Sequence, residues 1–167
     1  MSETSQPTAG GARKGGPVRD RTKSARRRAR EFALQGLYEW QLNPRDRGAV
    51  EAHVREQDEF AKCDRGHFDA IFNGCIEQRD ALDAALLKYL DRPVEELSPI
   101  EHAVLWLGAY ELAHCVDVPY KVAINEAVEL AKTFGGTDGH KYVNGVLDHL
   151  APVFRPDEVK AARSGRN

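Results

Sequence analysis

The chain has 167 residues, a formal net charge of -2, 41% hydrophobic residues and 30% charged residues. This length favours a single domain, and a globular chain of this size buries roughly 70% of its unfolded surface, so it can build a real core. The longest apolar run, residues 103–110, is far shorter than the roughly 20 residues that span a bilayer, and no N-terminal apolar run resembles a secretory signal, so we expect no membrane partner.

The charges are distributed unevenly along the chain. Residues 1–30 hold nine Lys and Arg and two acidic residues, whereas the other 137 residues hold 15 basic and 24 acidic ones. A basic arm on an acidic body is typical of proteins with an anionic partner, above all nucleic acid. The alternative is a solvated tail that aids solubility.

Cysteine and histidine spacing argues against disulfides and metal sites. The three cysteines are widely spaced and odd in number, which fits a reducing compartment and predicts a cytoplasmic protein. The six histidines show no metal-ligand spacing, and the chain contains no phosphate-binding loop, dinucleotide-binding loop or nucleophile elbow. We therefore expect no catalytic residue, no metal and no cofactor.

The first half of the chain predicts an unstructured arm followed by helices. Residues 1–23 are rich in Gly, Ser, Thr, Pro and basic residues, which predicts disorder. Ser24 is placed to cap a helix that ends at Asn43-Pro44. A weaker helix over 50–60 and a long one over 68–90 follow.

The second half carries stronger helix signals. Ser98-Pro99-Ile100-Glu101 combines a capping box with Pro at the first helical position, and it opens a helix apolar nearly all round that we expect at the centre of the core. A helix over 122–134 and a last helix capped by Asp138 complete the pattern. The sum is an all-α domain of about seven helices over 24–155, with a flexible tail over 156–167.

An arginine cluster marks the start of the first predicted helix, at Arg26, Arg27, Arg28 and Arg30. Cations at a helix N-terminus each cost about 0.3–1 kcal/mol, so the cluster suggests a functional site. Arginine suits phosphate because its planar fork binds two oxygens.

Tyr38 lies eleven residues after Arg27, about three helical turns, so the two side chains point nearly the same way. Charge for the backbone and a ring for stacking a base are the ingredients of single-stranded RNA binding. A position at the edge of the core is the alternative for this tyrosine.

Four segments, 25–31, 35–42, 117–132 and 140–148, resemble the transcription antitermination factor NusB family, and the resemblance extends over about 25–156. It implies two small packed helical bundles that bind boxA RNA of nascent ribosomal transcripts together with NusE, a small-subunit ribosomal protein. Other Nus factors and RNA polymerase would complete the antitermination complex. The positions it implies for RNA contact are Arg26, Arg27, Arg28, Arg30, Tyr38, Asp138, Lys141 and Tyr142, and those for partner contact are Tyr38 and Glu101.

Several alternatives remain open at this stage. Asn125 and Asn144 are either buried amides that tie helices together, which we favour, or surface ligands. Residues 135–139 either cradle an anion or join a helix C-cap to an N-cap, the more economical interpretation. Instead of a free factor, the chain could be the NusB-like domain of a ribosomal RNA cytosine methyltransferase, or a structural homodimer.

Overall fold

The computed structural model describes the backbone of residues 17–44 and 46–165, and within it the side chains from Ala25 onward. This part of the chain contains eight α-helices, two short 3-10 helices and no strand, which confirms the all-α prediction. The expected disorder of residues 1–16 lies outside the described residues. In chain order the elements are α1 (Pro17–Leu42), α2 (Arg47–Arg55), η1 (Asp58–Lys62), α3 (Arg65–Glu77), α4 (Arg79–Leu87), η2 (Val94–Glu96), α5 (Pro99–His114), α6 (Tyr120–Phe134), α7 (Gly139–Phe154) and α8 (Pro156–Ser164).

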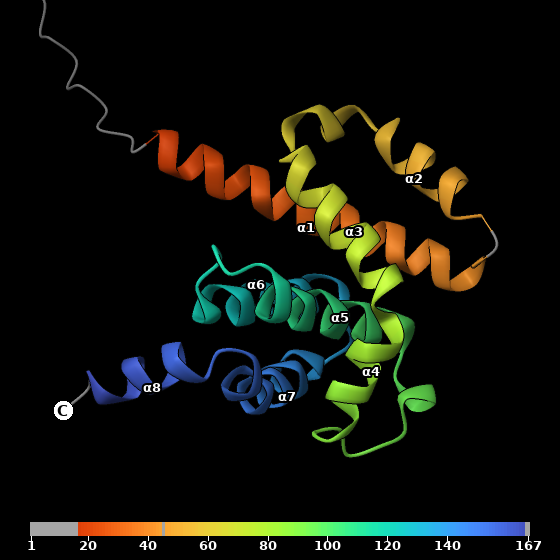
Figure 1. Ribbon diagram of the computed structural model, residues 1–167. Coiled ribbons are helices and arrows are strands. Elements are labelled where there is room, and N and C mark those ends of the chain that lie inside the picture. The colour runs from red at the N-terminus through yellow and green to blue at the C-terminus, as the bar shows by residue number, and fades with distance from the viewer. Residues whose placement is uncertain (1–16, 45, 166–167) are drawn as a thin grey trace, which may run out of the picture.

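The helices form two small bundles that meet along α5 (Figure 1). In the first bundle, α1 packs against α2, η1 and α3; in the second, α5 packs against α4, α6 and α7, and α8 packs against α7. Because α5 also contacts α1 and α3, it contributes to both bundles. Its side chains are buried almost continuously from Ala103 to Ala109, as its nearly uniform apolar sequence predicts.

Aromatic rings fill the first bundle, and a glycine allows the helices of the second to approach closely. Phe60 meets Phe68 edge-on with ring centroids 5.0 Å apart, and Phe68 stacks on Phe72 at 5.4 Å. A Cβ atom at Gly108 would lie 2.5 Å from Leu147 Cδ1, so a larger residue there would push α7 away from α5. This close packing follows the high density typical of protein interiors.

Helix ends agree with the sequence at α5 and differ elsewhere. Ser98 Oγ accepts a hydrogen bond from the Glu101 N–H at 3.1 Å, as the capping box predicts. The predicted long helix over 68–90 is two helices, because Gln78, with φ -103° and ψ 11°, lies outside helical geometry between α3 and α4. The last predicted helix continues through Pro152 to Phe154.

α1 begins at Pro17 rather than after Ser24, so the predicted boundary between arm and helix is wrong. Proline is well suited to the first turn of a helix, where its missing N–H has no partner to lose. Ser24 therefore lies inside the helix and is not its N-cap.

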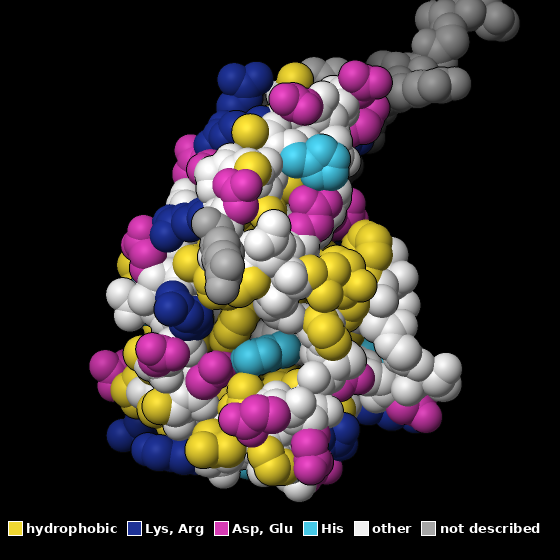
Figure 2. All heavy atoms as spheres, turned by 90° about the vertical axis from the view of Figure 1, so that its right-hand side faces the viewer, with side chains coloured by type: hydrophobic (Ala, Val, Ile, Leu, Met, Phe, Trp, Pro, Cys, Tyr) yellow, Lys and Arg dark blue, Asp and Glu magenta, His cyan; other side chains and the backbone are white. Residues whose placement is uncertain are grey.

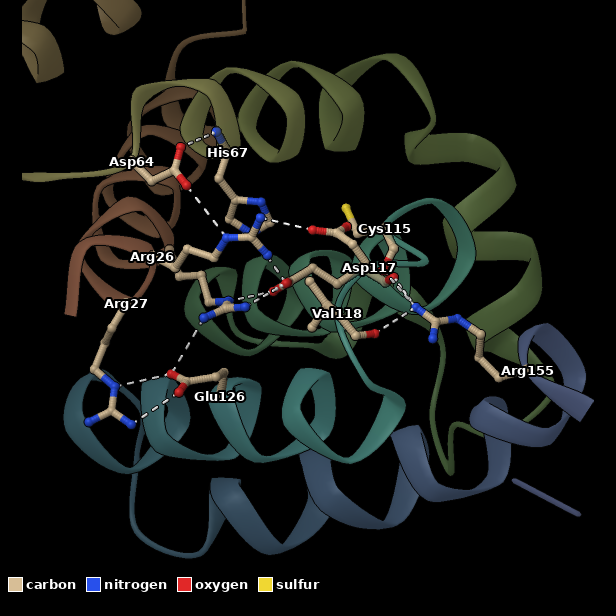
Figure 3. Close-up of polar contacts among 11 residues, drawn as sticks. Arg26, Arg27, Asp64, His67, Cys115, Asp117, Val118, Glu126 and Arg155 are labelled. Carbon is tan, nitrogen blue, oxygen red and sulfur yellow. Dashed lines mark hydrogen bonds and ion pairs between the residues drawn. The ribbon is translucent and has the colours of Figure 1, made fainter. Parts of the chain in front are cut away.

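The C-terminal segment predicted to be flexible instead forms α8, whose Val159 is 3% exposed. Arg155 attaches this helix to the second bundle. Its guanidinium donates to the backbone carbonyl oxygens of Glu111, Leu112, Cys115 and Val118 at 2.6–3.0 Å. These contacts fix the start of α8 against the end of α5 (Figure 3).

Candidate nucleic-acid interface

The arginine cluster lies within α1, starting nine residues after Pro17. The helix dipole acts mainly within the first turn, so the argument from misplaced N-terminal charge is wrong. Each guanidinium instead contacts a carboxylate on another part of the chain, and these contacts join α1 to η1, α5, α6 and the loops. Figure 3 shows the contacts of Arg26 and Arg27. The pairs are Arg26 with Asp117 and Asp64, Arg27 with Glu126, Arg28 with Glu59, and Arg30 with Glu111.

Arg30 is buried and has a structural role. Its side chain is 3% exposed, and its Nε and Nη2 donate to the two carboxylate oxygens of Glu111 at 2.7 and 2.8 Å. His67 Nε2 lies 3.2 Å from the same carboxylate. Burial raises the pKa of Glu111, but its hydrogen bonds with His67 and Arg30 outweigh burial and lower it. The expectation that Arg30 contacts RNA is therefore wrong, since a phosphate cannot reach it.

Arg27 is the most exposed arginine of the cluster. Its side chain is 46% exposed, while that of its partner Glu126 is only 5% exposed. Nε and Nη2 of Arg27 donate to the two Glu126 oxygens at 3.1 and 3.0 Å. This side-on contact holds the guanidinium in place and leaves Nη1 directed away from the carboxylate, available to a phosphate oxygen.

Arg26 and Arg28 present their guanidinium groups at the surface of the same helix. Arg26 Nη2 donates to Asp117 at 2.8 Å and Nε lies 3.4 Å from Asp64. The hydrogen bond from Arg26 lowers the pKa of Asp117. Arg28 contacts Glu59 at 3.3 Å, and both side chains are exposed by more than a third. Three arginines of the predicted cluster are thus reachable from solvent.

Tyr38 lines an apolar groove between α1, the start of α5 and the end of α6. The groove has a volume of about 370 Å³, and Leu34, Ile100 and Phe134 also line it. Tyr38 and Phe134 are 37% and 46% exposed. The tyrosine is neither fully exposed nor part of the core, so its ring can pack against a partner without leaving its place.

Figure 2 shows the side of the molecule where α1 ends. On this face hydrophobic side chains gather in separate patches, with Lys, Arg, Asp and Glu scattered between them. Such interleaved charges attract nucleic acid less than a surface of one sign. This face therefore offers no surface of one sign to nucleic acid.

The start of α7 brings together the other predicted residues. Asp138 has φ 67°, in the left-handed region, and its side chain does not cap α7 but lies 3.3 Å from Lys141 Nζ. The Glu101 carboxylate lies 3.0 Å from where a Cβ on Gly139 would be. The capping role predicted for Asp138 is wrong, because its side chain accepts no hydrogen bond from a backbone N–H of the first turn of α7.

Arg92 joins this cluster, and sequence reasoning missed it. Its guanidinium lies 4.7 Å from the centroid of the Tyr142 ring, and the Tyr142 hydroxyl accepts a hydrogen bond from the Asp91 N–H at 3.2 Å. Arg92 lies in the loop after α4, where no periodicity marks it. A residue directly before a proline indicates only a helix end.

Asn125 and Asn144 are both exposed, so the favoured prediction of buried amides is wrong. Val122 on the same helix as Asn125 is also exposed, by 39%. All three lie on exposed positions of α6 and α7.

The described part of the chain contains no group of three or more His, Cys, Asp or Glu side chains that could hold a metal ion. All three cysteines are free and buried. Among the described helices, none is long and apolar enough to cross a membrane.

Comparison with known proteins identifies one family. Residues 27–152 match the model of the NusB family. A Transcription antitermination protein NusB from Ralstonia pickettii is 64% identical over 84% of this chain and 91% of its own length. The protein of that name from Albidiferax ferrireducens is 54% identical over 93% of this chain and 85% of its own length.

Solved structures agree on the fold. NusB from T. maritima superposes with a TM-score of 0.70 at 27% identity, covering 80% of this chain and 96% of that chain. A chain from the structure of antitermination factors NusB and NusE in complex with dsRNA has a TM-score of 0.67 at 23% identity, covering 77% of this chain and 96% of that one.

Proposed function

Since this chain belongs to the NusB family, we propose that it is a transcription antitermination factor that binds boxA RNA of nascent ribosomal transcripts together with NusE. In this role it opposes premature termination by RNA polymerase, alongside other Nus factors. The observation that carries the proposal is 64% identity to a protein named for antitermination, over 91% of that protein's length.

The arginine cluster supports an RNA-binding role. Arg26, Arg27 and Arg28 are partly exposed and held by carboxylates, which reduces the conformational entropy lost when they meet phosphates. Phosphate contacts of this kind position an RNA strand but carry no sequence information directly. Selectivity for boxA therefore needs further contacts, and we assign these to Lys141, Tyr142 and Asp138 at the start of α7 and to the joint surface with NusE.

The apolar groove beside Tyr38 supports a protein partner. An exposed aromatic pair, Tyr38 and Phe134, over a partly buried apolar base is typical of the anchor region of a protein interface. We assign this surface to NusE, the partner named in the related complex with dsRNA. We also assign Glu101 to this partner, because it directly follows Ile100, which lines the groove.

In the proposed function the protein binds RNA and NusE and catalyses no reaction. We place it in the cytoplasm. The relatives reported above are named for antitermination rather than for RNA modification, so a methyltransferase domain is not favoured.

An electrophoretic mobility shift tests the proposal. The full chain, with and without NusE, is titrated against boxA RNA and against a scrambled RNA of the same length and composition. We expect a shift that is stronger for boxA and that NusE increases. Equal affinity for both RNAs in the presence of NusE would refute the boxA assignment.

A further inference from the structure

A second groove lies between α6, α7 and α8. It is at the start of α6, whereas the Tyr38 groove is at the end of that helix. Its volume is about 500 Å³. The buried side chains of Ile124, Ala151 and Val159 line its base. α8 forms one of its walls, and α8 lies beyond the residues that match the family model.

The wall formed by α8 is firmly held. Glu158, at the start of α8, accepts a hydrogen bond from Arg155 at 2.6 Å with one carboxylate oxygen and from the Tyr120 N–H at 3.1 Å with the other. Arg155 in turn bonds the carbonyl oxygens at the end of α5. The groove is therefore preformed, which lowers the entropic cost of binding.

Two carboxamides line this groove without partners in the described part of the chain. Asn125 on α6 and Asn144 on α7 are exposed, and neither side chain makes a hydrogen bond to another described residue. Each offers one carbonyl acceptor and one NH₂ donor group. This combination matches the donor and acceptor pairs on the edges of nucleobases.

The charges at the groove favour an anionic ligand. Lys121 on α6 and Arg163 on α8 line it, both are exposed, and within the described residues neither has a carboxylate within ion-pair distance. Asp148 is the one acidic side chain in the lining. The rings of Tyr120 and His149 are also part of the lining, and the His149 ring already stacks on Tyr89 with centroids 6.0 Å apart.

We propose that this groove binds single-stranded RNA immediately flanking boxA, with Asn125 and Asn144 on base edges and with Lys121 and Arg163 on phosphates. The inference rests on the proposed function, since it needs boxA bound elsewhere on the protein. Asn125 lines the groove, and the next residue of α6, Glu126, forms the ion pair with Arg27. The groove and the arginine cluster on α1 therefore lie against neighbouring faces of α6. A strand that crosses α1 can continue over α6 into the groove.

RNA fits better than an acidic peptide. Peptide docking typically depends on large apolar side chains that enter pockets, and the base of this groove offers only three small or buried apolar side chains. The two carboxamides can instead bind the edge of a base, and the two cations can bind phosphates.

The test compares two RNAs on the full chain with NusE: boxA alone, and boxA with single-stranded uridine flanks. We expect the wild type to bind the flanked RNA about tenfold more tightly than boxA alone. One additional bound nucleotide is sufficient for an increase of this size. Asn125→Ala combined with Asn144→Ala should remove most of this preference, and Lys121→Ala or Arg163→Ala should each reduce it by about threefold to tenfold. Lys160→Ala, an exposed charge on α8 that does not line the groove, should retain it.

The outcomes separate this inference from the proposed function. If the wild type does not bind boxA alone, the proposed function is refuted. If boxA alone binds while the flanks add nothing, or if the groove variants keep the full preference for flanks, only the groove inference fails. It also fails if a glutamate-rich peptide, and not the flanked RNA, shifts the side-chain amide NMR signals of Asn125 and Asn144. Thermal melts within a few degrees of wild type confirm that the variants are folded.

Discussion

Arg27 and Arg30 lie three residues apart on α1 and approach the same carboxylate, that of Glu126, yet their surroundings differ. Arg30 Nη1 is 3.9 Å from Glu126 and its side chain is 3% exposed, whereas that of Arg27 is 46% exposed. A buried guanidinium can stabilise the fold but cannot reach a ligand, whereas a partly exposed one can bind a phosphate. The two residues therefore give separable predictions for stability and RNA binding.

Replacing Arg27 with Ala should weaken RNA binding in a salt-dependent way. Each phosphate contact to a single strand contributes a slope of about -0.7 in log K against log salt, so losing one contact should flatten the slope by about 0.7. Binding measured between low and moderate salt checks this, with Lys88→Ala, an exposed charge after α4, as the control. An unchanged slope in Arg27→Ala would remove this residue from the RNA site.

Replacing Arg30 with Ala should instead lower stability. It leaves the buried carboxylate of Glu111 without its guanidinium partner, and breaking a buried ion pair from one side costs about 3–5 kcal/mol. Urea denaturation measures the loss. Arg30→Met combined with Glu111→Leu should recover part of it, because no uncompensated charge remains. A loss below about 1 kcal/mol in Arg30→Ala would show that the pair is not a strong constraint on the fold.

Among the helices, α8 depends most on a single side chain. Arg155 contacts four carbonyl oxygens and Glu158, while α8 itself buries only Val159. Arg155→Ala should release α8 and leave these buried carbonyls unsatisfied, at a cost of about 2–4 kcal/mol. Hydrogen exchange should show α8 losing protection while α5 keeps most of it. If α8 remains protected, its apolar contact with α7 is sufficient to hold it.

The sequence predicted elements whose signals are local. The Ser98 cap and the buried face of α5 depend on residues within one or two turns, so both were recognisable. α8 was not, because its docking depends on Arg155 bonding carbonyls about 40 residues earlier in the chain.

The same limit applied to the site. The positions of Arg27 and Tyr38 on one side of α1 followed from helical spacing, and both are exposed. The burial of Arg30 depends on Glu111, 81 residues away, and no local pattern shows it. Arg92 reaches Tyr142 from a loop that has no periodicity.

At the scale of the whole molecule, the junction between the two bundles carries the surface that we assign to the protein partner. The apolar groove beside Tyr38 lies at this junction, since α1, α5 and α6 all contribute to it. A partner seated there contacts both bundles, so its binding should also stabilise them against unfolding.

Replacing Tyr38 with Ala should therefore reduce affinity for NusE by about 1–3 kcal/mol, the range for an aromatic anchor at an interface. Isothermal titration of NusE in the absence of RNA measures the effect, and Tyr38→Phe should be nearly silent because the ring remains. If Tyr38→Ala lowers only the melting temperature and leaves the affinity for NusE unchanged, the tyrosine belongs to the edge of the core.

The buried charges between the bundles should also make stability fall in acid. The pKa of Glu111 is lowered from its ordinary value of 4.5, so between the two values the unfolded chain binds more protons than the folded one. The stability from this carboxylate is therefore present above about pH 4.5 and is lost as pH falls through the folded-state pKa.

Glu111→Gln isolates this contribution. The variant should be less stable than the wild type at pH 7, and the difference in free energy of unfolding should narrow below about pH 4.5, by at most about 1.4 kcal/mol per pH unit. Other carboxylates with lowered pKa values, such as Asp117, titrate in both proteins and cancel in the difference. Glu129→Gln, at an exposed carboxylate, should show no such narrowing. A constant difference from pH 7 down to the acid transition would mean that Glu111 stabilises the junction by packing, and not by its charge.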